Sequence, residues 1–155
     1  MFLVSRTFDE ALIYDCIVAS WKHVSDDGSP RADLYFPDIG QHNYWLTVHL
    51  HGEFLGIFLA SPHGTACKEV HAALLPNARG YAVGAAKQAI KWMFNNTECA
   101  RLIAWIPAYN RLAVNMARKS GMTVCGVNNK SFLKDGALHD EVLLGISKGE
   151  SCQSH

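Results

Sequence analysis

The sequence lacks an excess of charge of either sign. Fourteen Lys and Arg residues balance fourteen Asp and Glu residues, so the formal net charge at pH 7 is zero. The sequence also contains no block of five like charges. Without a net positive field or a basic cluster, the protein is not expected to bind nucleic acid or an anionic membrane surface through general electrostatic attraction.

Long apolar runs and cysteine motifs are missing as well. A membrane span needs about 18 or more consecutive apolar residues, and every apolar run here is far shorter. The first ten residues include acidic side chains and lack the long apolar stretch of a signal peptide. The five cysteines, Cys16, Cys67, Cys99, Cys125 and Cys152, have no CxxC spacing and are odd in number. These absences favour reduced thiols and a cytoplasmic location over a disulfide framework or a membrane anchor.

Length and composition favour a folded domain. The chain has 155 residues, of which 49% are hydrophobic and 18% are charged. That is enough apolar material for one buried core, and no linker-like segment divides the chain. We therefore expect a single domain over residues 1–148, as a monomer or homodimer, followed by a polar, flexible tail at 149–155.

The periodicity of apolar residues predicts an alternation of strands and helices. Strands are expected at 2–6, in 44–60 as a hairpin turning at 51–53, and at 67–76, 101–106, 122–127 and 141–146. Helices are expected from Thr7, over 80–94 and over 110–121. The polar stretch 21–43 reads as a long functional loop with one short helical turn at most. The resulting order, β-α-loop-β-β-β-α-β-α-β-β, is that of a mixed α/β sheet.

Two of the helices carry start and stop signals. Thr7 and Glu10 have the spacing of a capping box, which predicts that the first helix begins there. Asn110 is suited to be an N-cap, and Gly121 ends the same helix.

The stretch from Leu74 to Ile90, "LLPNARGYAVGAAKQAI", joins a strand to a helix through a turn that contains a cation and glycines. Helix N-termini present unpaired N–H groups and partial positive charge, and small residues let a phosphate approach them. The P-loop pattern is absent because no Gly-Lys is followed by Ser or Thr. A dinucleotide fingerprint fails too, because positions 80, 82 and 85 are Gly, Ala and Ala.

A third phosphate-binding pattern fits. Residues Arg79 to Gly84 resemble the Q/R-x-x-G-x-G/A signature of the GNAT family of N-acetyltransferases, with Pro76 three residues before the Arg. "NRLAVNMARKSGM", residues 110–122, is similar to the second motif of that family. The resemblance implies a GNAT-like fold and acetyl-coenzyme A as co-substrate, with no metal. The resemblance extends to compact, divergent members of the family that tailed phages encode. If this protein is one of them, its expected location is the host cytoplasm. The residues implied to bind coenzyme A are Leu74, Leu75, Arg79, Gly80, Tyr81, Ala82, Val83, Gly84, Ala85, Asn110 and Ala113.

Two positions depart from the family pattern. Ala82 stands where the signature has its middle glycine, and Ala117 stands where the family often has a tyrosine that protonates the leaving thiolate. Tyr109 or Ser120 is a candidate substitute. The alternative function is therefore a GNAT-fold binding or assembly module that has lost catalysis.

The implied reaction is transfer of an acetyl group to a primary amine, by direct attack in a ternary complex. Strand alternation places Glu69 and His71 on one face of the strand at 67–76, and either can be the general base. The N–H groups of Leu74 and Leu75 are candidates to stabilise the oxyanion. The amine, a small molecule or a peptide, is expected between residues 21–43 and 128–139. His49 and His51 share a strand face, but without further ligands they do not predict a metal site.

Overall fold

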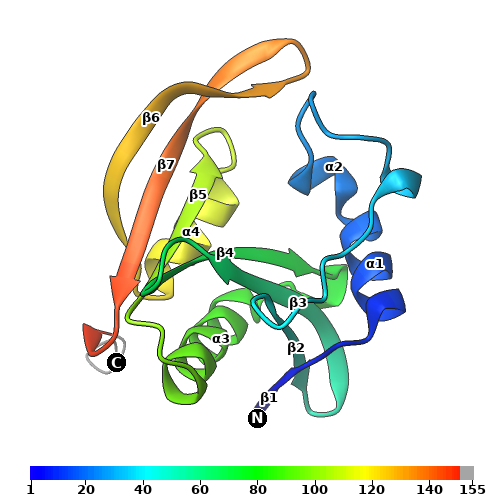
Figure 1. Ribbon diagram of the computed structural model, residues 1–155, viewed down its shortest axis with the longest axis vertical. Coiled ribbons are helices and arrows are strands. Elements are labelled where there is room, and N and C mark those ends of the chain that lie inside the picture. Colours follow the sequence, from blue (N-terminus) through cyan, green and yellow to red (C-terminus); the bar gives the residue numbers. More distant parts are fainter. Residues whose placement is uncertain (151–155) are drawn as a thin grey trace.

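A single seven-stranded sheet runs through the protein (Figure 1). The computed structural model describes residues 1–150. Residues 151–155 of the expected tail, which include Cys152, lie outside the described residues. Its elements are β1 (Phe2–Arg6), α1 (Glu10–Ala19), α2 (Trp21–Val24), η1 (Ala32–Leu34), β2 (Tyr44–Leu50), β3 (Glu53–Pro62), β4 (Cys67–Leu74), η2 (Pro76–Ala78), α3 (Ala82–Asn96), β5 (Arg101–Pro107), α4 (Arg111–Lys119), β6 (Thr123–Lys134) and β7 (Ala137–Ser147). The predicted order of strands and helices, and with it the mixed α/β class, is confirmed.

The strands lie in the order β1-β2-β3-β4-β5-β7-β6. All neighbours are antiparallel except β4 and β5, which are parallel and connected through α3. Hairpins join β2 to β3 and β6 to β7. Each turn places two consecutive residues at positive φ, His51 with Gly52 and Asp135 with Gly136, as two-residue turns between twisted strands require.

Helices cover both faces of the sheet. The larger core lies between the sheet and α3, whose residues Ala85, Ala89 and Met93 are buried. On the opposite face, Ile13 and Cys16 of α1 pack against Trp45 of β2. Burial on alternate sides of the strands follows from the two-residue period of strand side chains.

The parallel pairing of β4 with β5 is short. It runs only from the pair Cys67–Arg101 to the pair Glu69–Ile103. Within residues 1–150, the second half of β4 therefore has no strand beside it on that edge. Beyond Glu69 and Ile103, β4 and β5 separate, and the sheet has a gap between these two strands.

Three local predictions need correction. The strands expected at 122–127 and 141–146 are longer, because β6 and β7 pair along a hairpin that also takes in residues 128–134 and 137–140. Helix α1 begins at Glu10, with Asp9 as N-cap, because the Asp9 carboxylate accepts the Leu12 N–H at 3.1 Å. Thr7 stands outside the helix, and its hydroxyl accepts the Asp9 N–H instead. The loop at 21–43 contains two short helices, α2 and η1, rather than at most one helical turn. Across residues 1–150, no helix combines the length and the apolar character needed to cross a membrane.

Candidate active site

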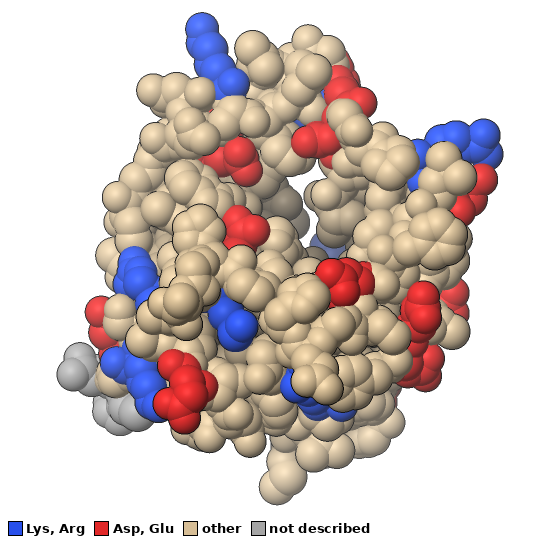
Figure 2. Space-filling view, viewed as in Figure 1, with Lys and Arg blue, Asp and Glu red and all other residues tan. Residues whose placement is uncertain are grey.

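A cavity of about 690 Å³ lies where β4 and β5 part. Its walls come from both sides of the sheet: from α3 and α4 on one side, and from α1, α2 and the loop that follows on the other. In the space-filling view the molecule is hollowed between the β6–β7 arm and the α1–α2 region, and acidic groups lie around this opening (Figure 2). Side chains from both faces of the sheet therefore line one cavity.

Glu69 and His71 of β4 both line this cavity. They share a strand face with Ala73, which packs against α1 in the smaller core, so they point to the α1–α2 side. The His71 Nε2 lies 3.1 Å from the Glu69 Oε2. This hydrogen bond is the main cause that lowers the pKa of the Glu69 carboxyl, against the opposing effect of partial burial. Glu69 is therefore ionised at neutral pH and accepts the hydrogen bond that His71 donates.

The open edge of β4 carries free backbone donors. The Leu75 N–H donates to the Leu55 oxygen at 2.9 Å and so points toward β3. Alternation along the strand turns the N–H groups of Ala72 and Leu74 the other way, to the edge where β5 has departed. Of the two residues expected to offer an N–H, only Leu74 is placed to do so, because the amide of Leu75 is already engaged.

The turn between β4 and α3 presents further unpaired donors. The N–H groups of Arg79, Tyr81 and Ala85 donate to backbone oxygens, but those of Gly80, Ala82, Val83 and Gly84 have no acceptor within residues 1–150. No side chain caps α3, whose N-cap residue is Tyr81. Gly80 has φ +87°, and the space beside it is open. Four unpaired amides at the positive end of a 15-residue helix fit the pyrophosphate of coenzyme A.

Two residues of the signature differ in what they contact. The Arg79 side chain is exposed and forms no ion pair within the described chain, so it is available to a phosphate. Gly84 has a packing role: a Cβ there would lie 2.7 Å from the Phe2 ring of β1. The small size of Gly84 therefore lets β1 approach α3, and the group that Gly84 can offer to a ligand is its N–H.

Helix α4 forms another wall, where Asn110, Ala113 and Ala117 line the cavity. Asn110 is the N-cap, and its Oδ1 accepts the Ala113 N–H at 3.2 Å. Of the two candidate substitutes for the missing tyrosine, Ser120 lines the cavity and Tyr109 does not. The Ser120 hydroxyl donates to the Met116 oxygen at 2.6 Å. Tyr109 packs on the His139 ring, 4.6 Å between centroids, outside the cavity lining.

Sequence reasoning missed a further carboxylate and an aromatic wall. Cross-strand partners point to the same face of a sheet. The pairs Glu69–Ile103, Trp105–Leu143 and Pro107–Glu141 therefore share the face that bears His71. Glu141 and the aromatic residues Trp21, Tyr35, Trp45, Trp105 and Phe132 all line the cavity. The residues of this wall come from distant parts of the chain, so no local motif could have signalled it.

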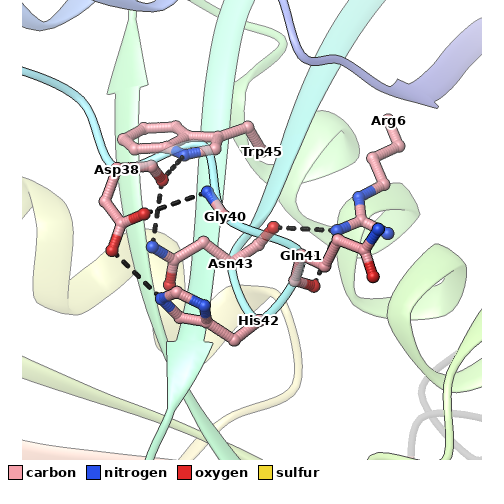
Figure 3. A network of polar contacts seen from close by, with 7 residues as sticks. All are labelled: Arg6, Asp38, Gly40, Gln41, His42, Asn43 and Trp45. Atoms are coloured by element: carbon pink, nitrogen blue, oxygen red, sulfur yellow. Dashed lines mark hydrogen bonds and ion pairs between the residues drawn. The ribbon is translucent and has the colours of Figure 1, made fainter.

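The loop that forms one wall of the cavity is fixed at its C-terminal end by a polar network (Figure 3). The Asp38 backbone oxygen accepts the Trp45 Nε1–H at 2.8 Å and the Asn43 Nδ2–H at 3.0 Å. Arg6 donates to the backbone oxygens of Gln41 and Asn43, and its guanidinium lies 3.9 Å from the centroid of the Tyr44 ring. These contacts hold the loop against β1 and β2.

At its N-terminal end the loop is joined to the tip of the β6–β7 arm. The Asp27 carboxylate accepts the N–H groups of Asp135 and Gly136, each at 2.8 Å. The Lys134 ammonium donates to the backbone oxygens of Lys22 and Ser25 at 2.9 and 2.8 Å. We call these four hydrogen bonds the clasp. The clasp bridges the two sides of the opening seen in Figure 2.

The clasp should respond to acid. The N–H groups of Gly136 and then Asp135 lower the pKa of the Asp27 carboxyl, because they bind its ionised form. Because the pKa of Asp27 is lower in the folded protein, its ionised carboxylate contributes fully to stability above the pKa of an ordinary Asp. This contribution to stability is lost as the pH falls through the lower pKa of the folded state. We expect the amide proton shifts of Asp135 and Gly136, followed by NMR, to titrate below the range of ordinary aspartates. The same shifts should show no such titration in Asp27→Asn, and titration in the ordinary range in the wild type would contradict the expectation.

Comparison with known sequences identifies the family. Residues 26–148 match a family model described as a protein of unknown function, DUF2824. The chain belongs to the DUF2824 family. A search of curated proteins finds no match for this DUF2824 chain.

Comparison with solved structures identifies the fold of this DUF2824 protein. A GNAT-family acetyltransferase from Streptococcus pneumoniae superposes with a TM-score of 0.70 at 16% identity, covering 96% of this chain and 100% of the other. Spermidine N-acetyltransferase from Vibrio cholerae, in complex with CoA and spermine, superposes with a TM-score of 0.75 at 15% identity, covering 97% and 98%. The fold of the DUF2824 chain is thus the GNAT acyltransferase fold.

Proposed function

We propose that this protein is an acetyl-coenzyme A-dependent N-acetyltransferase that acts on a primary amine in a ternary complex. One observation carries the proposal: the open edge of β4 leads directly to four unpaired amides at the start of α3. A strand edge with free N–H groups, followed by an anion-binding helix N-terminus, suits an elongated ligand that ends in a pyrophosphate. The solved neighbour that contains CoA has the same fold at low identity, which supports the proposal.

In this proposal His71 is the general base and Glu69 orients it. The ionised Glu69 carboxylate has only acceptor atoms, so the proton shared between them stands on the His71 Nε2. The Nδ1 of the neutral imidazole is then free to accept a proton from the incoming ammonium. Glu69 also stabilises the imidazolium that results, because the charges are opposite and adjacent.

Acetyl-coenzyme A supplies an acetyl group activated as a thioester. The amine nitrogen forms a C–N bond to the carbonyl carbon, the C–S bond breaks, and the proton lost by the ammonium passes to His71. The Leu74 N–H is placed to donate to the carbonyl oxygen as negative charge develops there. Position 117 offers no acid, so in this proposal the second proton that the nitrogen loses, after it has attacked, passes through a water molecule to the departing thiolate.

Ala117 also favours a second candidate, a module with the same fold that has lost catalysis. It is buried and lines the cavity at the position where the resemblance places a tyrosine. Such a module has no need of a hydrogen-bonded Glu69–His71 pair. Turnover of acetyl-coenzyme A with any amine would exclude this candidate.

Acetyl-coenzyme A is expected to raise the melting temperature. A ligand that binds only the folded state at 100 times its Kd adds about 2.7 kcal/mol. For a domain of this size that corresponds to about 5–10 °C. The measurement is a thermal melt followed by circular dichroism, with coenzyme A and acetate as separate controls. Coenzyme A should reproduce most of the shift through its pyrophosphate, and acetate should produce none. A folded protein with no shift at millimolar ligand would refute the proposed function.

A further inference from the structure

The cavity lining contains two carboxylates but no lysine or arginine. The two carboxylates are those of Glu69 and Glu141. The negative charge of Glu69 is partly balanced by its hydrogen bond to His71. Glu141 has no such partner: within residues 1–150 it forms no ion pair, and its side chain makes no hydrogen bond.

The surroundings of Glu141 make an unpaired carboxylate costly. The residue is only partly exposed, and the aromatic wall adjoins it through Trp105 and Phe132. Removing a carboxylate from water without a partner is unfavourable, and a cation that enters the cavity relieves that cost. Aromatic faces attract the same cations through their quadrupoles.

The position of Glu141 separates it from the reacting nitrogen. His71 lies on β4 and Glu141 on β7, with β5 between them. Two strand spacings alone separate their Cα atoms by about 10 Å, and β4 has already left β5 before His71. Glu141 is therefore set apart from His71 across the cavity, and a cation that pairs with it fits a second group of the acceptor better than the reacting nitrogen.

We propose that the acceptor is a small organic dication, whose second positive group binds Glu141 while its first nitrogen reacts beside His71. This inference rests on the proposed function, because it specifies the amine for that site. The apolar and aromatic wall accommodates the uncharged part of the molecule between its two nitrogens. Acidic amino acids, and amines with an anionic second group, are rejected by the same carboxylate.

The test compares three probes of equal length: α,ω-diaminoalkanes, n-alkylamines and ω-amino acids. Their affinities are measured by calorimetry without acetyl-coenzyme A, so the result does not depend on turnover. We expect the diamine to bind about 10- to 100-fold more tightly than the monoamine, as one charge-assisted contact allows. Glu141→Gln should abolish that difference. Glu98→Gln, which removes an equal charge from an exposed position outside the lining, should preserve it.

Two outcomes would overturn the inference: equal affinity for diamine and monoamine, or an undiminished preference for the diamine in Glu141→Gln. Failure of the proposed function gives a different result. In that case acetyl-coenzyme A leaves the melting temperature unchanged, whereas the diamine preference and its dependence on Glu141 are still decided by calorimetry.

Discussion

Replacing His71 by alanine is expected to lower kcat by about 10²- to 10⁴-fold, the usual range for loss of a general base. Affinity for acetyl-coenzyme A should stay within about twofold, because the unpaired amides of α3 do not involve His71. Glu69→Gln should cost less activity, since the glutamine oxygen still accepts the Nε2–H of His71. The measurement is thiol release with a diamine acceptor, together with binding of coenzyme A by calorimetry.

The pH profile distinguishes a base from an orienting group. Losing the Glu69 charge removes the partner of the imidazolium, so the acid limb of kcat/KM should shift to lower pH in Glu69→Gln. If Glu69 were itself the base, the limb would vanish in that variant and persist in His71→Ala. His51→Asn, which changes an exposed histidine in the β2–β3 turn outside the cavity lining, is the control and should retain full activity. Full activity in both test variants would refute an acid–base role for the pair.

Placing a carboxylate at the first position of α3 should remove binding of coenzyme A while the fold persists. We expect Ala82→Asp to weaken affinity on the order of 100- to 1,000-fold. Like charges about 4 Å apart near a protein surface repel by about 4 kcal/mol, and the new carboxylate competes for the same N–H groups. The helix itself should gain slightly, by about 0.3–1 kcal/mol, because acidic residues are favourable in its first turn.

The isosteric variant Ala82→Asn separates charge from size. Ala82→Asn should lose much less affinity for coenzyme A than Ala82→Asp. The melting temperatures of both variants should stay close to that of the wild type. Equal affinity in all three proteins would show that the phosphates do not lie at the start of α3. Gly84 is unsuitable for this purpose, because any side chain there first meets Phe2 and perturbs packing.

Local signals allowed much of the fold to be predicted. Strand and helix periods gave the order of the elements, and the N-cap at Asn110 was found because the cap depends on residues three apart. The same kind of signal was wrong at Thr7. Two potential caps stand close together there, and Asp9 caps the helix in the structure while Thr7 binds the Asp9 N–H. Sequence alone does not decide between neighbouring caps of similar strength.

The candidate site was predictable only where it is local. The Arg79–Gly84 turn is contiguous, and Glu69 and His71 are two residues apart on one strand face. Glu141 was missed because it joins the site only through the pairing of β7 with β5. The hydrogen bond of the Leu75 N–H depends on Leu55 of β3, and the contact of Gly84 depends on Phe2 of β1. Both partners lie far away in the sequence, so neither contact could be predicted from it.

The clasp has a consequence for the order in which the molecule assembles. Asp27 and Gly136 are 109 residues apart, whereas the turn that carries the unpaired amides is completed by neighbours along the chain. Contacts between distant residues form late, because closing a long loop costs entropy before the contact contributes. During synthesis the loop after α1 must wait for almost the whole chain before its partner exists. The enclosure between this loop and the β6–β7 arm is therefore the last part to form and, since three of the four clasp hydrogen bonds are exposed, the first to open in local unfolding.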